Sequence, residues 1–282
     1  MKVRKVVLTF VAVAVVLGAF IGAATPPQRV VVAGIPLYSE ILISLGLLDR
    51  IVGVADSPEN PPEVAGLPRV GPVWHPSLEA IVALSPDLVL GPPPLLRDQL
   101  ESLGVATFSG GGEDMWITDI LEVLATIEQV GQLMGVAREA QILTGEIAKA
   151  ILALEAKVLG RERPSAAVLY LYDPAGAPYV AGRGTPEDEV ISRGGGVNAF
   201  RDLDGYVQVG VETILARDPA VLFVGTGQRD NLVRHVTLSV LTAVREGRVF
   251  EIAASHLVST RVAEVLEAVA RALHPAAFAE GK

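Results

Sequence analysis

The chain has 282 residues, no cysteine and a formal net charge of −9. The missing cysteine excludes disulfides, thiolate metal sites and cysteine nucleophiles together. The acidic balance argues against nucleic acid and anionic lipid as partners, and the length is enough for one large or two modest domains held by their cores alone.

The first 24 residues have the order of a secretion signal. Three basic side chains, Lys2, Arg4 and Lys5, precede an apolar run over residues 6–21, and small residues follow. This order predicts an exported protein, periplasmic or extracytoplasmic, whose signal peptide is cleaved after Ala24. The alternative is an uncleaved anchor, because the run approaches the length needed to cross a bilayer. No cysteine follows the run, which excludes a lipid-modified cysteine.

Strand and helix patterns alternate from residue 25 to residue 135. Short β-branched runs bounded by Gly and Pro predict buried strands, and apolar residues at helical spacing predict helices. We expect strands at 30–33, 51–54, 88–90 and 105–107, and helices at 39–45 and 78–84. Such alternation is typical of a mainly parallel, Rossmann-like sheet, so residues 25–135 are predicted to form an N-terminal α/β lobe.

A long segment without strand patterns follows. Gly131 and Gly135 divide it, and its second part carries one apolar helical face with spacings of 4, 4, 3 and 4, made by Leu143, Ile147, Ile151, Leu154 and Val158. A helix over 136–159 would be about 36 Å long, enough to run past a whole lobe. Residues 136–160 are therefore predicted to link two lobes, with an ordinary packed helix as the alternative.

The alternation resumes after Pro164. Strand patterns cover 166–172, 179–181, 221–224 and 249–252, and helix patterns cover 211–216 and 262–273. These predict a second α/β lobe over residues 161–282. The expected fold is therefore two α/β lobes with mainly parallel sheets, joined by one long helix.

An internal repeat supports two related lobes. Residues 78–90 align without a gap on residues 211–223, at a constant offset of 133, with Glu, Ile, Ala and Pro identical. Each copy is a short helix, a proline break and a buried strand. A shared preference for that local structure explains the Ile, Ala and Pro better than it explains the matched Glu79 and Glu212.

Five stretches resemble one known family, the helical-backbone periplasmic binding proteins that serve ABC importers of cobalamin, haem and ferric siderophores. The stretches are 43–54, 70–74, 78–90, 195–200 and 272–275, in the family's order, so the similarity spans residues from about 29 to 275. The resemblance implies two lobes joined by one rigid helix, a ligand held between them and no enzymatic activity. It also implies a monomer without a cofactor of its own, whose partner is an importer permease with its ATPase.

The same resemblance gives the matched glutamates a role. Family members present one surface glutamate on each lobe to arginines of the permease, and those positions correspond to Glu79 and Glu212. A surface glutamate is otherwise only a solvated residue, and an exposed ion pair is worth about 0–1 kcal/mol. We therefore expect Glu79 and Glu212 to dock on the permease.

The loops beyond the predicted strands are where open α/β sheets bind ligands. Aromatic residues make up only 5% of the chain, yet four lie in or beside these loops: Tyr38, Trp74, Tyr172 and Tyr179. A large, flat, partly apolar ligand needs such surfaces. Trp74 matches a position where cobalamin binders of the family carry a tryptophan, so the resemblance favours cobalamin or another corrinoid as ligand.

Polar candidates leave haem and ferric siderophores open as alternatives. His75 and His256 are candidate ligands of iron or cobalt, with His75 the candidate axial ligand, and Tyr38 and Tyr206 are candidate ligands of haem iron. Haem-binding relatives, however, carry their tyrosine near the position of Trp74. Arg183 is a candidate partner for a propionate, an amide or a catecholate. The predicted ligand-binding set is thus Tyr38, Trp74, His75, Tyr172, Tyr179, Arg183 and His256.

An exported α/β enzyme is the less favoured class. The first strand runs into Gly34-Ile35-Pro36 and not into a dinucleotide-binding glycine turn, no Walker loop is present, and no His-Glu-x-x-His occurs. Ser109 is not in a nucleophile elbow, because Thr107 replaces the required glycine. The glycine runs 110–112 and 194–196 are interpreted as turns entering helices.

Overall fold

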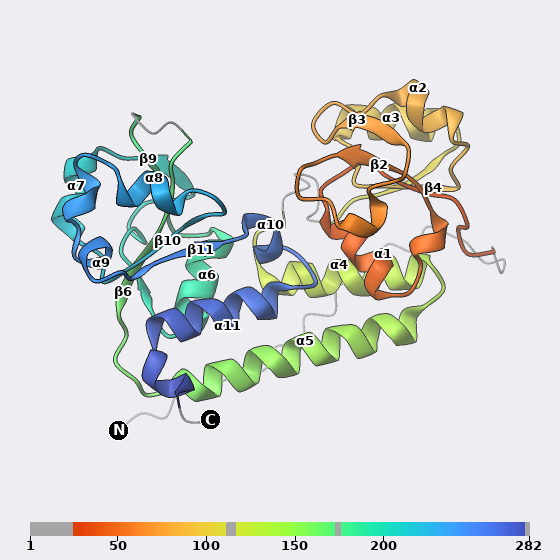
Figure 1. Cartoon of the computed structure of the whole chain (residues 1–282). Coiled ribbons are helices and arrows are strands. Elements are labelled where there is room, and N and C mark those ends of the chain that lie inside the picture. Colours follow the sequence, from red (N-terminus) through yellow and green to blue (C-terminus); the bar gives the residue numbers. More distant parts are fainter. Residues whose placement is uncertain (1–24, 111–116, 173–175, 280–282) are drawn as a thin grey trace.

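The computed structural model describes residues 25–110, 117–172 and 176–279. Two α/β lobes lie side by side, and the long helix α5 (Ala137–Val158) runs beneath both (Figure 1). The predicted secretion signal, residues 1–24, lies outside the described residues. Within the described ranges, no helix is long and apolar enough to cross a membrane.

The N-terminal lobe contains a five-stranded sheet in which every pair of neighbours is parallel. Its strand order is β3-β2-β1-β4-β5, with bounds β1 Val30–Val32, β2 Ile51–Asp56, β3 Arg69–Pro72, β4 Leu88–Leu90 and β5 Ala106–Phe108. The helices of this lobe are α1 Leu37–Ser44, α2 Leu78–Ala83 and α3 Pro94–Ser102. The central strand β1 and its neighbour β4 are buried along their whole length, as expected for a parallel sheet covered on both faces.

The C-terminal lobe contains a sheet of mixed direction, with strand order β11-β10-β6-β7-β9 and β8 paired to β6. Four of its strands pair in parallel. Strand β6 (Ser165–Tyr170) pairs with β8 (Val197–Asn198) and β10 (Val221–Gly225), and β10 pairs with β11 (Val249–Ile252). In contrast, β7 (Tyr179–Ala181) is antiparallel to both β6 and β9 (Tyr206–Gln208). The sheet therefore gains an antiparallel extension beyond β6 that the N-terminal sheet does not have.

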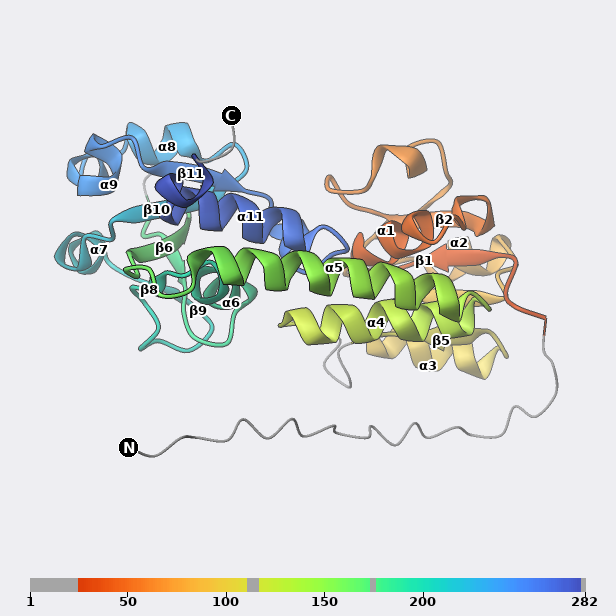
Figure 2. The same cartoon turned by 90° about the horizontal axis from the view of Figure 1, so that it is seen from below.

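Three helices join the lobes into one body. Helix α4 (Ile120–Leu133) packs beside the N-terminal part of α5, and α11 (Val262–Leu273) packs beside its C-terminal part (Figure 2). The predicted apolar face of α5 faces inward, since Ile147, Ile151, Leu154 and Val158 are all buried. One apolar cluster accordingly runs from β1 through these helices to β6 and β10 in the other lobe. The prediction of a long joining helix is confirmed, with ends one residue inside those expected.

The repeated segments adopt the same backbone conformation. Residues 78–90 form α2 and β4, and residues 211–223 form α7 (Val211–Arg217) and most of β10. Among the described residues, only Ser85 (φ 46°) and Asp218 (φ 35°) have positive φ without being glycine, and they stand at the repeat offset of 133. Such a conformation is costly for a side chain with a Cβ, so its presence at matched positions supports the internal repeat.

Several short elements escape the sequence patterns. The remaining helices are α6 Pro186–Arg193, α8 Arg229–Val233, α9 Thr242–Arg245 and α10 Ala254–Leu257. Gly194 is the C-terminal cap of α6, and Gly195 and Gly196 lead from it toward β8. The interpretation of 194–196 as a turn entering a helix is therefore wrong: these glycines end one, and Gly195 has the positive φ (86°) common just after a helix. Of the other run, residues 111 and 112 lie outside the described residues.

Candidate functional site

The carboxyl ends of both parallel strand sets lie at the boundary between the lobes. From the N-terminal lobe, Glu40 of α1 reaches Thr260 Oγ1 at 3.5 Å, and the backbone N–H of Ile120 donates to Glu189 Oε2 at 2.9 Å. From the C-terminal lobe, β6 and β11 lead directly into residues of the same region. This inter-lobe region, called the cleft below, is the place where open α/β sheets bind ligands.

A cavity of about 480 Å³ occupies the cleft. Ile117 and Thr118 contribute to it from the N-terminal side, and Ala254, Leu257 and Val258 form an apolar patch after β11. The rest of its wall comes from the loops and strand ends around β6, α6 and β9: Tyr170, Tyr172, Gly184, Thr185, Pro186, Glu187, Gly205 and Tyr206. The wall is mainly apolar and aromatic with few polar groups, as in most sites for sizeable organic ligands.

Four of the five tyrosines of the chain form one cluster at this wall. Tyr170 and Tyr172 stack with ring centroids 5.9 Å apart and planes 9° apart, while Tyr206 and Tyr179 contact them at 6.2 Å and 6.1 Å respectively. Tyr170 is the last residue of β6 and Tyr172 lies two residues beyond it, so the two rings keep the same-face spacing of an extended chain. Gln228 Oε1 accepts the N–H of Leu171 at 2.9 Å and so braces the backbone between the two rings.

Beneath the tyrosines lies a buried carboxylate, Glu187, which is 1% exposed. Its Oε1 accepts a hydrogen bond from Tyr170 Oη at 2.5 Å, and its Oε2 accepts one from Tyr206 Oη at 2.8 Å. Glu187 stands in the first turn of α6, after the cap Thr185 and the first helical residue Pro186. The unpaired N–H groups of that turn favour negative charge, so two hydroxyls and a helix terminus together offset the burial of this carboxylate.

The same contacts raise the pKa values of the tyrosines. Burial raises the pKa of Tyr170 most, and the charge and hydrogen bond of Glu187 raise it further. Burial is also the largest cause at Tyr206, followed by Glu187, and again the pKa is raised. Both hydroxyls therefore keep their protons at neutral pH and act as hydrogen-bond donors to Glu187.

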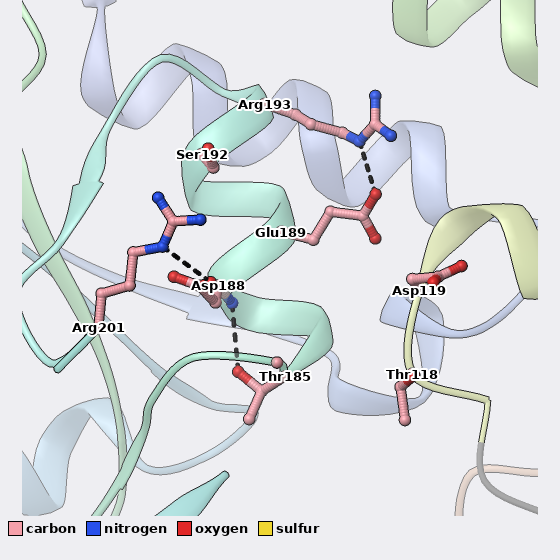
Figure 3. Close-up of a pocket in the computed structure, with 9 residues that line it drawn as sticks. Thr118, Asp119, Thr185, Asp188, Glu189, Ser192, Arg193 and Arg201 are labelled. Carbon is pink, nitrogen blue, oxygen red and sulfur yellow. Dashed lines mark hydrogen bonds and ion pairs between the residues drawn. The ribbon is translucent and has the colours of Figure 1, made fainter. Parts of the chain in front are cut away.

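A second, polar cavity of about 390 Å³ adjoins the first, since both share Thr118, Gly184 and Thr185 (Figure 3). Its charges compensate one another. Arg193 Nε donates to Glu189 Oε1 at 2.7 Å, its Nη1 donates to Glu155 at 2.6 Å, and Arg201 Nε lies 3.4 Å from Asp188 Oδ2. Glu189 also accepts the N–H of Ile120, so this network ties α6 to α4 and α5 across the lobes. We assign it a role in holding the lobes together.

A third cavity, of about 610 Å³, lies between α1, the loop after β2 and the start of α11. His256 Nε2 is 3.0 Å from Arg261 Nη1, which in turn contacts Glu264 through its other nitrogens at 2.8 Å and 3.0 Å. Since arginine always donates, His256 Nε2 is the acceptor. Burial, and next the charge of Arg261, lower the pKa of His256. The imidazole is therefore neutral, with its Nε2 already occupied.

The predicted ligand residues fall into different places. Tyr172 and Tyr179 belong to the tyrosine cluster, and Tyr172 is 74% exposed. Tyr38 is 3% exposed, accepts the N–H of Gly110 on its Oη at 2.8 Å and meets Phe108 edge-on, so its side chain supports loops of the N-terminal lobe. Arg183 pairs with Asp204 at 2.6 Å and is not among the residues that line the cleft cavity.

Trp74 and His75 follow β3 at the cleft-facing edge of the N-terminal sheet. Asp56 pairs with Pro72, so the loops after β2 and β3 leave the same edge. The loop after β2 carries Glu59, whose charge is close enough to contribute to the raised pKa of Tyr172, after burial and Glu187. Trp74 is 57% exposed, and neither Trp74 nor His75 is among the residues that line the cleft cavity.

Two central residues of the site, Tyr170 and Glu187, are missing from the predicted set, and Tyr206 entered only as a candidate iron ligand. Tyr170 lies inside a predicted strand, but its spacing of two from Tyr172 could have placed both rings on one face. The segment Thr185-Pro186-Glu187 has the cap, proline and acid order of a helix start. That order indicates α6, but not that Glu187 turns inward.

The two predicted docking glutamates lie on α2 and α7, and these helices belong to separate lobes, away from α5 (Figure 1). Glu79 and Glu212 are both exposed and both stand in the first turn of a short helix, α2 and α7 respectively. Hydrogen bonds from its own backbone N–H and from Ser77 Oγ lower the pKa of Glu79, so its carboxylate is charged at neutral pH. No group of three or more His, Asp or Glu side chains suited to a metal occurs in the described part of the chain.

Comparison with known proteins agrees with this architecture. The family described as periplasmic binding protein matches residues 31–255. Over 208 residues the chain is 31% identical to the vitamin B12-binding protein of Vibrio parahaemolyticus serotype O3:K6, covering 71% of this chain and 72% of the relative.

Solved structures show the same fold. The apo periplasmic haem-binding protein RhuT from Roseiflexus sp. RS-1 has a TM-score of 0.75 at 26% identity, covering 89% of this chain and 99% of its own. The periplasmic vitamin B12-binding protein BtuF of Vibrio cholerae has a TM-score of 0.74 at 24% identity, covering 90% and 99%. With two lobes, one joining helix and a family match over most of its length, the chain belongs to the periplasmic binding protein family.

Proposed function

We propose that this protein captures a corrinoid, with cobalamin as the favoured ligand, in the cleft between its lobes and delivers it to an ABC importer. The observation that carries the proposal is the cleft cavity walled by three tyrosines of the cluster, Tyr170, Tyr172 and Tyr206, and by an apolar patch. Stacked and half-exposed rings offer a broad apolar surface with few polar groups, which suits a large macrocycle. The similarity to a vitamin B12-binding protein supports the same ligand class.

Haem is the second candidate, because a haem-binding protein shares the fold. A tyrosine that ligates ferric iron acts as a phenolate. The raised pKa values of Tyr38 and Tyr206, caused first by burial in both cases, oppose that form. His256 Nε2 is occupied by Arg261, which leaves His75 as the exposed candidate axial ligand. These observations favour the corrinoid over haem.

A direct titration tests the ligand class. Protein lacking residues 1–24 would be titrated with cyanocobalamin, haemin and ferric siderophores, following intrinsic fluorescence and visible absorbance. We expect the tightest binding with cyanocobalamin, and no change in the haemin spectrum when His75 is replaced by Ala. Tighter binding of haemin, with a spectrum that shifts in the His75→Ala variant, would replace the corrinoid by haem.

Delivery is proposed to use Glu79 and Glu212 as the contacts with the permease. Their exposure and their matched places in the internal repeat support this role. The double variant Glu79→Ala/Glu212→Ala should bind cyanocobalamin as tightly as the wild type while uptake into cells or vesicles that carry the importer is impaired. The exposed pair Glu139→Ala/Glu146→Ala on α5 carries the same charge change and is the matched control. Weaker binding in the first double variant would place those residues in ligand recognition instead.

A further inference from the structure

We infer that Glu187, acting through the hydroxyls of Tyr170 and Tyr206, makes the cleft select a chelate whose edge carries N–H donors and reject one whose edge carries carboxylates. The inference rests on the proposed capture function and names the feature of the ligand that the site reads. Glu187 is a positioning residue here: at 1% exposure it acts through the two tyrosines that cover it.

The two hydrogen bonds to Glu187 fix the direction in which the tyrosine hydroxyls donate. Both oxygens of Glu187 accept a proton from a tyrosine, Oε1 from Tyr170 and Oε2 from Tyr206. A tyrosine hydroxyl has one proton to donate and lone pairs to accept with. Once that proton points at Glu187, only the lone pairs of the two Oη atoms remain for a ligand. This part of the cavity wall therefore accepts hydrogen bonds and does not donate them.

The charge of the cavity wall is the second determinant of ligand selection. None of the described residues that line the cavity is Lys, Arg or His. The arginines nearest in the C-terminal lobe each pair with a carboxylate: Arg183 with Asp204, Arg193 with Glu189 and Glu155, and Arg201 with Asp188. Arg97, whose Nε and Nη2 atoms are buried, lies near Tyr38 in the N-terminal lobe and does not line this cavity. The buried charge of Glu187 is thus met only by hydroxyls and a helix terminus.

Together, the acceptor hydroxyls and the charge of Glu187 discriminate between ligands by the chemical groups at their edges. A corrin ring carries neutral acetamide and propionamide arms, whose N–H groups can donate to the tyrosine oxygens. A propionate on a porphyrin edge finds no donor at these two hydroxyls and is repelled by Glu187. Because charges in a poorly solvated cavity interact more strongly than in water, one carboxylate in place of one amide should weaken binding by about tenfold.

Matched ligands and matched variants test this. The probes are cyanocobalamin and its monocarboxylic acids, in which one peripheral amide is hydrolysed, so that shape is kept and one negative charge is added. For the wild type we expect the acids to bind about tenfold more weakly. In Glu187→Gln the charge is gone, and the amide can turn one tyrosine proton toward the ligand. The ratio between the two probes should then fall toward unity, while Glu139→Gln, an exposed change on α5, should keep the wild-type ratio.

A second variant separates this reading from a loss of packing and serves if Glu187→Gln does not fold. Tyr206→Phe removes one acceptor from the half-exposed ring but leaves the charge of Glu187. We expect it to weaken cyanocobalamin binding and to keep discrimination against the acids. Loss of discrimination in Tyr206→Phe, or a wild type that binds both probes equally, would overturn the inference while leaving corrinoid capture intact. A wild type that binds neither probe would overturn the proposed function and this inference with it.

Discussion

Tyrosines in the two lobes have opposite hydrogen-bond roles. In the N-terminal lobe, Tyr38 of α1 accepts the N–H of Gly110 and ties this helix to the loop after β5. In the C-terminal lobe, Tyr170 and Tyr206 donate to Glu187 at the wall of the cleft. The first arrangement satisfies a backbone donor, as a fold requires, whereas the second holds a buried carboxylate beside the cleft cavity. On the proposed function, we infer that the N-terminal lobe supports the cleft and that the C-terminal lobe determines its chemical selectivity.

The N-terminal lobe can be destabilised by a substitution that leaves the tyrosine cluster unchanged. A Cβ on Gly34 would lie 2.7 Å from the Cα and the O of Gly91, where β1 and β4 run into neighbouring loops. Backbone atoms cannot move aside, so Gly34→Ala should lower the free energy of unfolding by about 3 kcal/mol. Urea denaturation measures this, with Gly66→Ala, which meets nothing within 4 Å, as control. Equal stability of the two variants would mean that the loops after β1 and β4 are not closely packed.

Alkaline titration sharpens the comparison between the tyrosines. Burial raises the pKa of Tyr170 above the ordinary value of 10.0, and Glu187 adds to the rise. The folded state therefore keeps a proton that the unfolded state loses. The stabilising contribution of this proton is fully present below about pH 10. Above that pH the free energy of unfolding should fall by about 1.4 kcal/mol per pH unit because of this group. In Tyr170→Phe the slope of stability against pH should decrease by that amount, as measured by urea denaturation at several pH values.

Tyr38 should respond differently in the same titration. Its pKa is also raised by burial, but the N–H of Gly110 and the charge of Arg97 oppose the rise. We expect the tyrosinate absorbance of Tyr38 to appear at lower pH than that of Tyr170, identified by its loss in Tyr38→Phe. The reverse order would contradict the assigned roles of the two hydroxyls.

The helix that joins the lobes offers a change in the stabilising direction. Gly145 is exposed in the middle of α5, and a Cβ there would meet nothing within 4 Å. Gly145→Ala should raise the free energy of unfolding by about 1 kcal/mol, because alanine favours the helix and restricts the unfolded chain. A higher melting temperature with unchanged cyanocobalamin affinity is expected. A lower affinity would show instead that binding requires α5 to bend.

The smallest expected effect is on ligand affinity, when one aromatic residue from each side of the cleft is replaced. Tyr172→Ala and Trp74→Ala each remove an exposed ring, and each should weaken cyanocobalamin binding by about fivefold, since one aromatic contact is worth about 1 kcal/mol. Isothermal titration gives both values, and Leu95→Ala on α3 removes an equally exposed apolar side chain as control. If only Tyr172→Ala weakens binding, Trp74 does not take part in recognition.

Much of the fold could be predicted from the sequence because it is recorded in local periodicity. The apolar face of α5 and the closing helix α11 were predicted to within one residue at each end. The strand at 179–181 was predicted, but its antiparallel direction was not, because a short apolar run contains no information about direction, and β9 was not predicted at all. Likewise, Glu187 has the sequence pattern of an ordinary first-turn acid, and only the tertiary packing of β6, α6 and β9 turns it toward Tyr170 and Tyr206.

The apolar cluster that runs through α4, α5 and α11 into both sheets has a consequence for unfolding. Two lobes with separate cores would melt in two steps, but a core shared across the junction couples them. Loosening either lobe also exposes the inner face of α5 on which the other depends. Heating in a calorimeter should therefore give a single cooperative transition, and a ligand held between the lobes should shift that transition as a whole.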